Sequence, residues 1–371
     1  MNIRKTSTLV EEAKRGILAI NNSERTLPRT GFDCVDSHIG GLLPGDVVLF
    51  SGLSGHGKSE TLYRVRKNIL DKKINPEADE YMFIDLAFEM KALNILLRGV
   101  SKEMGKSKRS VLFDKFTEEE LEKMNEYVNS LKDDRQFTVE EPAPPEDFYH
   151  DMCILLDSEH SRSKKGIFIA IDHMLLLEGS DKQKVIEKTI ESINKLKLKF
   201  DNVYFILLSQ LNRNLLQRAE DKNNKAQPNA TDLFGSSFMD QISNYNIILF
   251  DAYKSGIEQY CKLNPIRYEY LKEHFGEEDS KGRYSLIAED RIFYHVEKAR
   301  ESDNPYKNIF VEVKETNLDN EDLMTRARAF DKKAKEQSEI SSIVNQSPPP
   351  PVFDAVEFNT LDKSSAKGEG F

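Results

Sequence analysis

Short apolar runs alternate with longer amphipathic stretches along the middle of the chain. The runs are DVVLFS at 46–51, YMFIDL at 81–86, GIFIAID at 166–172, VYFILLS at 203–209 and YNIILFD at 245–251. Nearly continuous apolar runs that are separated by helices are typical of parallel strands buried on both faces. The pattern therefore predicts an α/β fold with a mainly parallel central sheet, helices on both faces, and ligands at the carboxyl ends of the strands.

Both ends of the chain differ from this middle part. Residues 7–20 predict an amphipathic helix whose apolar face is formed by Leu9, Ala13, Ile17 and Ile20. Such an isolated helix needs an apolar surface, which either its own domain or a neighbouring chain would supply. The polar stretch that follows contains Pro28 and reads as a linker, so we expect the globular part to begin near Gly31.

Towards the C-terminus, the runs SLIAED, RIFYHVEKA and NIFVEVKE have the spacing of hairpin strands and predict a small antiparallel extension. Residues 321–346 are charged and predict a helix or a frayed segment. The tail begins with four prolines within 347–371 and has too little apolar surface to fold alone, so we expect it to be disordered. The predicted organisation is a leading helix and linker at 1–30, one domain at 31–320, the charged segment and the tail.

Composition limits the possible functions. The 53 basic and 63 acidic residues give a formal net charge of −10, which excludes a generally basic surface for nucleic acid. A nucleic-acid site would need a local basic lining, since phosphate attraction acts within about 10 Å at moderate salt. The three cysteines are far apart, which argues against a disulfide scaffold or a cysteine zinc site. No apolar run approaches the roughly 18 residues that span a bilayer, so we expect a soluble, cytoplasmic protein.

The strongest motif is GLSGHGKS at 52–59, which fits G-x-x-x-x-G-K-[ST] and lies between an apolar strand and a helical segment. Its glycines let backbone N–H groups turn towards phosphates, Lys58 would reach the β and γ phosphates, and Ser59 would bind Mg²⁺. We therefore expect ATP and Mg²⁺ as ligands. The expected nucleotide contacts are Gly52, Gly55, His56, Gly57, Lys58, Ser59 and Glu60.

Three further residues follow predicted strands and suit nucleotide hydrolysis. Asp172 ends an apolar strand, where a carboxylate can hold Mg²⁺ through water. Glu89 could orient or deprotonate the attacking water, or could be an acid at the start of a helix. Gln210 could sense the γ phosphate, or could belong to an ordinary strand-to-loop junction. Together these residues indicate a magnesium-dependent ATPase or kinase.

The order of the motifs resembles the ATPase domain of bacterial and phage replicative helicases of the DnaB type, members of the RecA-like superfamily. Phe88-Glu89-Met90 is similar to the family's Leu-Glu-Met motif with its catalytic glutamate, and Asp172-His-Met-Leu to its Asp-Tyr-Leu-Gln magnesium site. The run into the phosphate loop is also similar, as are Ser209-Gln-Leu-Asn-Arg213 and Gln217-Arg-Ala219. The resemblance spans about residues 7–315.

This resemblance implies a RecA-like phosphate-loop core and a homo-hexameric ring with ATP between subunits. Lys298-Ala-Arg300 is similar to the family's Lys-Gln-Arg, whose arginine reaches the nucleotide of the adjacent subunit, so Lys298 and Arg300 are further candidates. The helix at 7–20 would pack on the neighbouring subunit. The implied activity is ATP-driven unwinding with 5′ to 3′ movement on single-stranded DNA. The tail could bind a replisome or loader partner through Phe353, Val356, Phe358 and Phe371, or it could be a solubilising segment whose aromatic residues are incidental.

Two departures from the family bear on partners. The family's N-terminal domain, which usually receives primase, has no counterpart before Gly31, which suggests a phage or mobile-element version. The family's channel loop, Arg-Glu-Ser-Gly, is here Phe234-Gly235-Ser236-Ser237. Its N–H groups and hydroxyls can still bind phosphates, and Phe234 could stack on a base or anchor the loop. Basic residues of the preceding stretch could line the channel or form a solvated loop: Arg213, Arg218, Lys222 and Lys225.

Two other functions compete with the helicase. A RecA-fold ATPase that forms filaments or regulates without unwinding is favoured by the altered channel loop and the acidic charge. A small-molecule kinase would transfer phosphate as a monomer, and the resemblance at Ser209–Arg213 and Arg300 argues against it.

Overall fold

The computed structural model describes residues 5–22, 25–32, 34–36, 40–87, 92–141, 143–172, 181–212, 215, 228–233, 236–263, 275–278, 284–289, 291–300 and 308–313. These residues belong to one compact unit, Met1–Arg326. The predictions for 321–346 and 347–371 lie outside the described residues.

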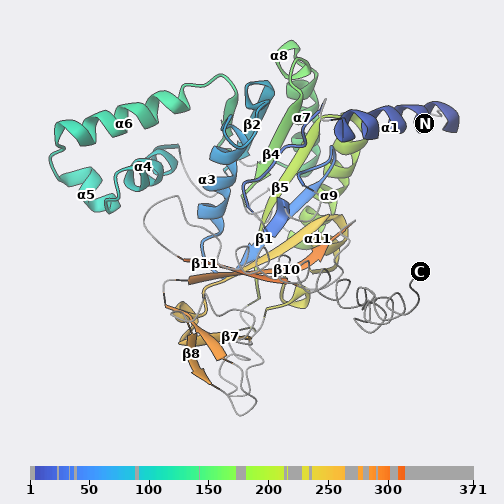
Figure 1. The fold of residues 1–371 in the computed structure, drawn as a ribbon. Helices are drawn as coiled ribbons and strands as arrows, with labels where there is room; N and C mark the ends of the chain where they lie inside the picture. Colours follow the sequence, from blue (N-terminus) through green and yellow to red (C-terminus); the bar gives the residue numbers. More distant parts are fainter. Residues whose placement is uncertain are drawn as a thin grey trace, which may run out of the picture. The chain divides into compact units, whose positions relative to one another are not determined.

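An eight-stranded sheet forms the centre of this unit, with the strand order β11-β10-β6-β1-β5-β4-β2-β3 (Figure 1). The six strands from β6 to β3 are parallel, whereas β10 runs antiparallel to both β6 and β11. The bounds are β1 Val47–Gly52, β2 Tyr81–Leu86, β3 Gln136–Val139, β4 Gly166–Ile171, β5 Val203–Gln210, β6 Tyr245–Phe250, β10 Arg291–Ala299 and β11 Asn308–Val313.

The five parallel strands predicted from apolar runs are confirmed. Every residue of β1, β2, β4 and β6 is buried, which explains why these strands are apolar at nearly every position instead of alternating. The edge strand β3 has no such signal, because its four residues, QFTV, are half-buried or exposed. It pairs with β2 from Phe83 to Leu86.

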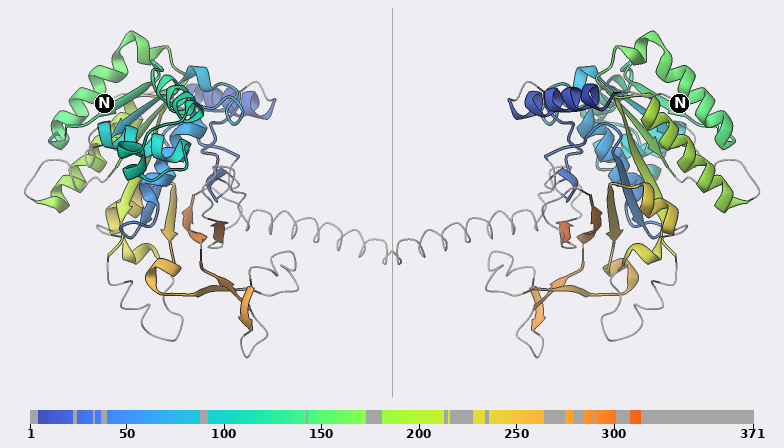
Figure 2. Two further views of the ribbon diagram at one scale, coloured as in Figure 1. Left: turned by 90° about the vertical axis from the view of Figure 1, so that its left-hand side faces the viewer. Right: turned by 90° about the vertical axis from the view of Figure 1, so that its right-hand side faces the viewer.

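Helices cover both faces of the sheet. The chain moves from β1 towards the β3 edge and then returns through β4 and β5 to β6, so right-handed crossovers place α3 and α7 on opposite faces. Figure 2 shows α7 and α9 on the face opposite α3. The helices are α1 Thr6–Asn21, α3 Lys58–Ile69, α4 Ala92–Glu103, α5 Lys108–Phe113, α6 Glu118–Leu131, α7 Pro145–Asp157, α8 Glu159–Arg162, α9 Lys182–Lys199 and α11 Ser236–Ile242.

Side-chain hydrogen bonds at their first turns explain where α6 and α9 begin. Thr117 and Glu120 form a capping box in which each side chain accepts a hydrogen bond from the other's backbone N–H. Asp181 accepts hydrogen bonds from the N–H groups of Gln183 and Lys184 at the start of α9. Both caps satisfy donors that the first helical turn leaves without partners.

The predicted antiparallel extension is present, but its strands divide between two sheets. β10 and β11 extend the central sheet, as expected for RIFYHVEKA and NIFVEVKE. The first run, SLIAED, instead supplies β9 (Tyr284–Ile287) to a separate sheet of order β7-β9-β8, with β7 at Gln259–Leu263 and β8 at Phe275–Glu278.

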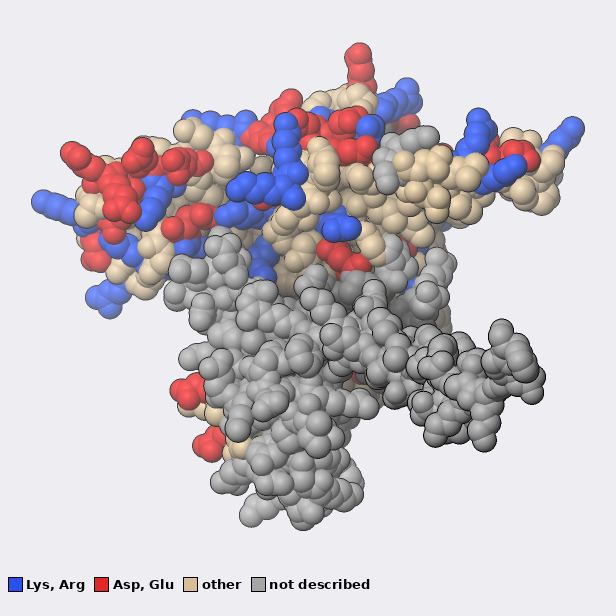
Figure 3. All heavy atoms as spheres, in the orientation of Figure 1, with Lys and Arg blue, Asp and Glu red and all other residues tan. Residues whose placement is uncertain are grey.

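The leading helix α1 forms as predicted and keeps apolar side chains at the surface. Val10 is 56% exposed and Ile17 is 66% exposed. Among the described residues, no helix has the length and apolar character needed to cross a membrane. On the face drawn in Figure 3, basic and acidic side chains are intermingled over the described residues, in line with a net charge of −10.

Candidate functional site

The phosphate-loop motif connects β1 to α3 at the carboxyl edge of the sheet. Gly55 and Gly57 have φ angles of 78° and 93°, which L side chains rarely adopt, and Gly57 is the N-cap of α3. A Cβ atom at Gly52 would lie 2.9 Å from the carbonyl oxygen of Leu249. The loop therefore requires glycine at these positions, and it directs the N-terminus of α3 towards any bound anion.

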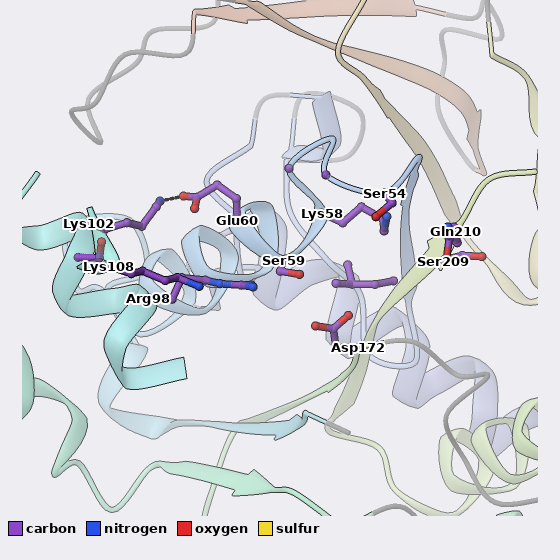
Figure 4. A pocket seen from close by; sticks show the side chains of 14 residues that line it. Ser54, Lys58, Ser59, Glu60, Arg98, Lys102, Lys108, Asp172, Ser209 and Gln210 are labelled. Atoms are coloured by element: carbon purple, nitrogen blue, oxygen red, sulfur yellow. Dashed lines mark ion pairs between the residues drawn. The ribbon is translucent and has the colours of Figure 1, made fainter. Parts of the chain in front are cut away.

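This loop borders a cavity of about 520 Å³ (Figure 4). The cavity lies at the carboxyl ends of β1, β4 and β5, where ligands gather in parallel sheets. The residues that line it are Ser54, Gly55, Gly57, Lys58, Ser59, Glu60, Arg98, Ser101, Lys102, Lys108, Asp172, Leu208, Ser209 and Gln210.

Four residues predicted from three separate motifs meet in this cavity: Lys58, Ser59, Asp172 and Gln210. Gln210 pairs in register with Gly52, so the strand pairing of β1 and β5 brings it beside the loop. The N–H of Asp172 donates to the carbonyl oxygen of Leu86 (3.2 Å), which fixes the chain just past the end of β4. The sheet register thus assembles the site.

The donor set fits a nucleotide with its magnesium ion. Lys58 folds over the loop, where its Nζ donates to the carbonyl oxygens of Gly52 (2.9 Å) and Leu53 (3.0 Å). A hydroxyl from Ser59 and a carboxylate from Asp172 line the same cavity, and oxygen ligands of this kind suit Mg²⁺. The cavity can therefore hold phosphates at the loop and a hard cation beside them.

Helices α4 and α5 add positive charge that the sequence analysis missed. Arg98 and Lys102 of α4 and Lys108 of α5 line the cavity, and Figure 4 shows Arg98 extending towards Ser59. Lys102 forms an ion pair with Glu60 of α3. The spacing of Arg98 and Lys102, four residues apart on one helix, places them on a common face, but only the packing of α4 shows that this face borders the phosphate loop.

A buried ion pair lies behind the loop. Arg66 of α3 and Asp85 of β2 approach to 3.5 Å, and both side chains are only 10% exposed. Burial raises the pKa of Asp85 to about 6, with Arg66 lowering it and Asp172 raising it. Asp85 borders a smaller cavity of about 40 Å³ together with Ser59, Arg98 and Asp172. In the sequence, Asp85 is an acidic residue inside the otherwise apolar run YMFIDL, and this position could have marked it as a candidate site residue.

His56 contributes its backbone to the loop and its side chain to the core. The ring is 4% exposed, packs 5.7 Å from the Phe250 ring, and accepts a hydrogen bond at Nδ1 from the N–H of Asp251 (3.0 Å). Of the described residues, those that line the cavity do not include His56 or Gly52, although both were predicted to contact the nucleotide. Glu60 does line the cavity, where it forms an ion pair with Lys102.

Lys298 and Arg300 lie at the end of β10. Lys298 donates to the carbonyl oxygen of Asp240 and lies 3.6 Å from its carboxylate. The Arg300 guanidinium donates to the carbonyl oxygen of Gln241 (2.6 Å), and its N–H donates to that of Asn244 (2.9 Å). Neither residue is among the described residues that line the nucleotide cavity of their own chain.

The remaining predicted site residues fall into two groups. Those outside the described residues are Glu89, Arg213, Arg218, Lys222, Lys225, Phe234 and Gly235. Ser236 and Ser237 begin α11, and only their backbone is described. The described flanks of this stretch do meet: Leu211 and Leu233 form an antiparallel bridge, and the N–H of Asn212 donates to the carbonyl oxygen of Asp232 (2.7 Å).

Comparisons with known proteins identify the family of the chain and its fold. The family model for the DnaB-like helicase C terminal domain matches residues 28–270. Two solved structures share the fold. "ATPase Domain of G40P" matches with a TM-score of 0.61 and 14% identity, over 84% of this chain and 96% of that chain. "The Structure Of A DnaB-Like Replicative Helicase And Its Interactions With Primase" matches with a TM-score of 0.56 and 15% identity, over 84% of this chain and 65% of that one.

No curated protein sequence matches the chain. The family model nevertheless covers well over half of its length and includes every part of the nucleotide cavity described above. The mainly parallel sheet with helices on both faces has the RecA-like fold. The chain therefore belongs to the family of the DnaB-like helicase C-terminal domain.

Proposed function

We propose that this protein is an ATP-driven replicative DNA helicase that assembles as a homo-hexameric ring and moves 5′ to 3′ on single-stranded DNA. One observation carries the proposal: Lys58, Ser59, Asp172 and Gln210 share a single cavity at the carboxyl edge of the sheet. Membership of a helicase family supports the coupling of this site to DNA, and the family supports a role in replication.

The site's residues suit ATP hydrolysis. The loop N–H groups and Lys58 bind the phosphates, while Ser59 and Asp172 hold the magnesium ion that neutralises charge on the β and γ phosphates. We assign the general base to Glu89, three residues beyond the end of β2. We also assign Arg98, which lines the cavity from α4 (Figure 4), a contact with the terminal phosphate.

The exposed apolar side chains support assembly by head-to-tail contacts. One set lies on α1 and includes Ile17, at 66% exposed. Another lies on α4 and α5, where Leu93, Leu112 and Phe113 are 71%, 57% and 79% exposed. Figure 1 shows these helices on different sides of the described unit. Contacts between two different surfaces generate rings when the rotation closes, so we propose that α1 packs on α4 and α5 of the next subunit.

Arg300 is proposed to act on the nucleotide of the neighbouring subunit. Its exposed guanidinium is bonded to a carbonyl oxygen of α11 and does not border its own cavity, and Lys298 lies two residues before it. An arginine supplied from a neighbour stabilises charge in the transition state, by about 10³ to 10⁵ in rate for related fingers. Hydrolysis would then depend on subunit contact.

DNA contact is proposed for the segment that follows Gln210. The bridge between Leu211 and Leu233 closes this segment at its base, so a shift at Gln210 can pass directly to Phe234 and the start of α11. The proposed DNA contacts are Arg213, Arg218, Lys222, Phe234, Gly235, Ser236 and Ser237. Backbone N–H and hydroxyl groups of this kind position phosphates without reading sequence.

The test is ATP turnover with and without single-stranded oligonucleotides. We expect DNA to stimulate turnover and Lys58→Ala to abolish it. Lys72→Ala is the matched control, because Lys72 pairs with Asp79 at the surface and lies outside the cavity lining. Turnover that requires Lys58 and ignores DNA would contradict the helicase and favour a regulatory or filament-forming ATPase.

A further inference from the structure

Asp85 is an acidic residue in a strand that is otherwise apolar. It lies in β2, one position before the strand ends, and pairs in register with Ala170 of β4. Because side chains alternate along a strand, Asp85 faces the same side of the sheet as Asp172, two positions beyond Ala170. Two steps along a strand and one across place the two Cα atoms about 8 Å apart. That spacing leaves room for water between the carboxylates.

Only one oxygen of this carboxylate is paired. Oδ2 lies 3.5 Å from Arg66 Nη1, whereas Oδ1 is buried and has no hydrogen-bond partner in the described part of the chain. Asp85 as a whole is 7% exposed. Buried polar atoms almost always have a partner, so this oxygen calls for a water or an ion that the protein atoms do not supply.

The space beside Asp85 can hold such a partner. The cavity of about 40 Å³ that it borders is also lined by Ser59 and Asp172, the two proposed magnesium ligands. That volume accommodates about two or three water molecules. Magnesium usually keeps several waters, and protein groups that bond to those waters orient the ion.

Tyr63 holds the Arg66 side chain in place. Its guanidinium lies 5.5 Å from the Tyr63 ring centroid, and the Tyr63 hydroxyl donates to Glu103 (2.8 Å). Arg66 therefore supports Asp85 through one oxygen, while the Asp85 side chain borders the small cavity. Breaking a buried pair by removing one partner is destabilising, so the test needs a variant that replaces both partners.

We infer that Asp85 is a positioning residue of the magnesium site: it accepts a hydrogen bond from a water that also binds the ion held by Ser59 and Asp172. Arg66 fixes the orientation of the Asp85 carboxylate. This inference rests on the nucleotide and magnesium site of the proposed function, and it requires neither DNA binding nor unwinding.

The experiment measures binding of a fluorescent ATP analogue to the full chain as Mg²⁺ is titrated, without DNA. Asp85→Asn should raise the Mg²⁺ concentration for half-maximal binding about 10-fold, the size expected when a partner of a metal ligand is lost. Binding in EDTA should not change. Asp79→Asn is the matched control, because Asp79 is an exposed acid outside the small cavity and should leave the midpoint unchanged.

A second variant separates magnesium positioning from a structural ion pair. Arg66→Gln with Asp85→Asn replaces the pair by two amides, so no charge stays buried alone if Asp85→Asn by itself fails to fold. The inference predicts that this double variant keeps the raised Mg²⁺ midpoint. A midpoint equal to that of the wild type in the folded variant overturns it.

The same titration distinguishes this inference from the proposed function. A wild-type chain that binds the Mg²⁺ nucleotide but does not unwind DNA contradicts the helicase alone. A wild-type chain whose nucleotide binding ignores Mg²⁺ overturns both the inference and the proposed site.

Discussion

Replacing Gly99 by alanine tests how closely α4, which carries Arg98, must pack on α6. A Cβ atom at Gly99 would lie 1.8 Å from the Tyr127 hydroxyl oxygen, 2.3 Å from Cζ and 2.7 Å from Cε1. Tyr127 is only 7% exposed, so its ring cannot simply move into solvent. Alanine in a helix is favoured over glycine by about 1 kcal/mol, whereas overpacking costs about 1 to 3 kcal/mol. Because all three contacts are shorter than 3.0 Å, we expect the upper part of that cost, about 2 to 3 kcal/mol, and therefore a net loss of about 1 to 2 kcal/mol.

Urea unfolding and nucleotide binding measure the two effects of this change. Gly16→Ala is the matched control, because Gly16 also lies within a helix and a Cβ there meets nothing within 4 Å. That control should be neutral or more stable by up to about 1 kcal/mol. Gly99→Ala should also weaken nucleotide binding, since a displaced α4 moves Arg98. Removing the hydroxyl with Tyr127→Phe should restore part of the loss. Equal stability of Gly99→Ala and wild type would refute the packing argument.

Three further predictions follow from the site and the surface. Without Mg²⁺, ionisation of Asp85 should lower the free energy of unfolding as pH rises from about 4 to 7, because the folded state holds this proton more tightly than the unfolded state. In urea unfolding over this range, the wild type should lose about 3 kcal/mol relative to Asp85→Asn, and parallel pH curves for the two proteins would contradict this. Arg98→Ala should lower ATP turnover at least 10-fold with little change in unfolding, and normal turnover would exclude a contribution of Arg98 to hydrolysis. Phe113→Asp should reduce the assembled fraction in light scattering without unfolding the chain, whereas an unchanged mass would rule out α5 as a contact.

The parallel strands and the phosphate loop could be predicted because their signals are local. A parallel strand that is buried on both faces is apolar at nearly every position, as in β1 and β4, and the loop requires glycine at Gly55 and Gly57 for its φ angles. Strand register then explains why Asp172 and Gln210, far apart in sequence, meet at one edge.

The missed parts depend on packing between distant segments. Arg98 and Lys108 border the cavity because α4 and α5 pack near α3, and no spacing in the sequence reveals this. The strand β3 is short and lies at an edge, so it has neither an apolar run nor clear alternation. The separation of β9 from β10 into different sheets depends on their pairing partners, β7 and β6, and not on their own residues.

The most direct test of the helicase is strand displacement from partial duplexes with either a 5′ or a 3′ single-stranded tail. The account predicts ATP-dependent displacement from the 5′-tailed substrate, none from the 3′-tailed one, and loss of activity in Lys58→Ala. Robust ATP turnover with no displacement from either substrate would contradict it.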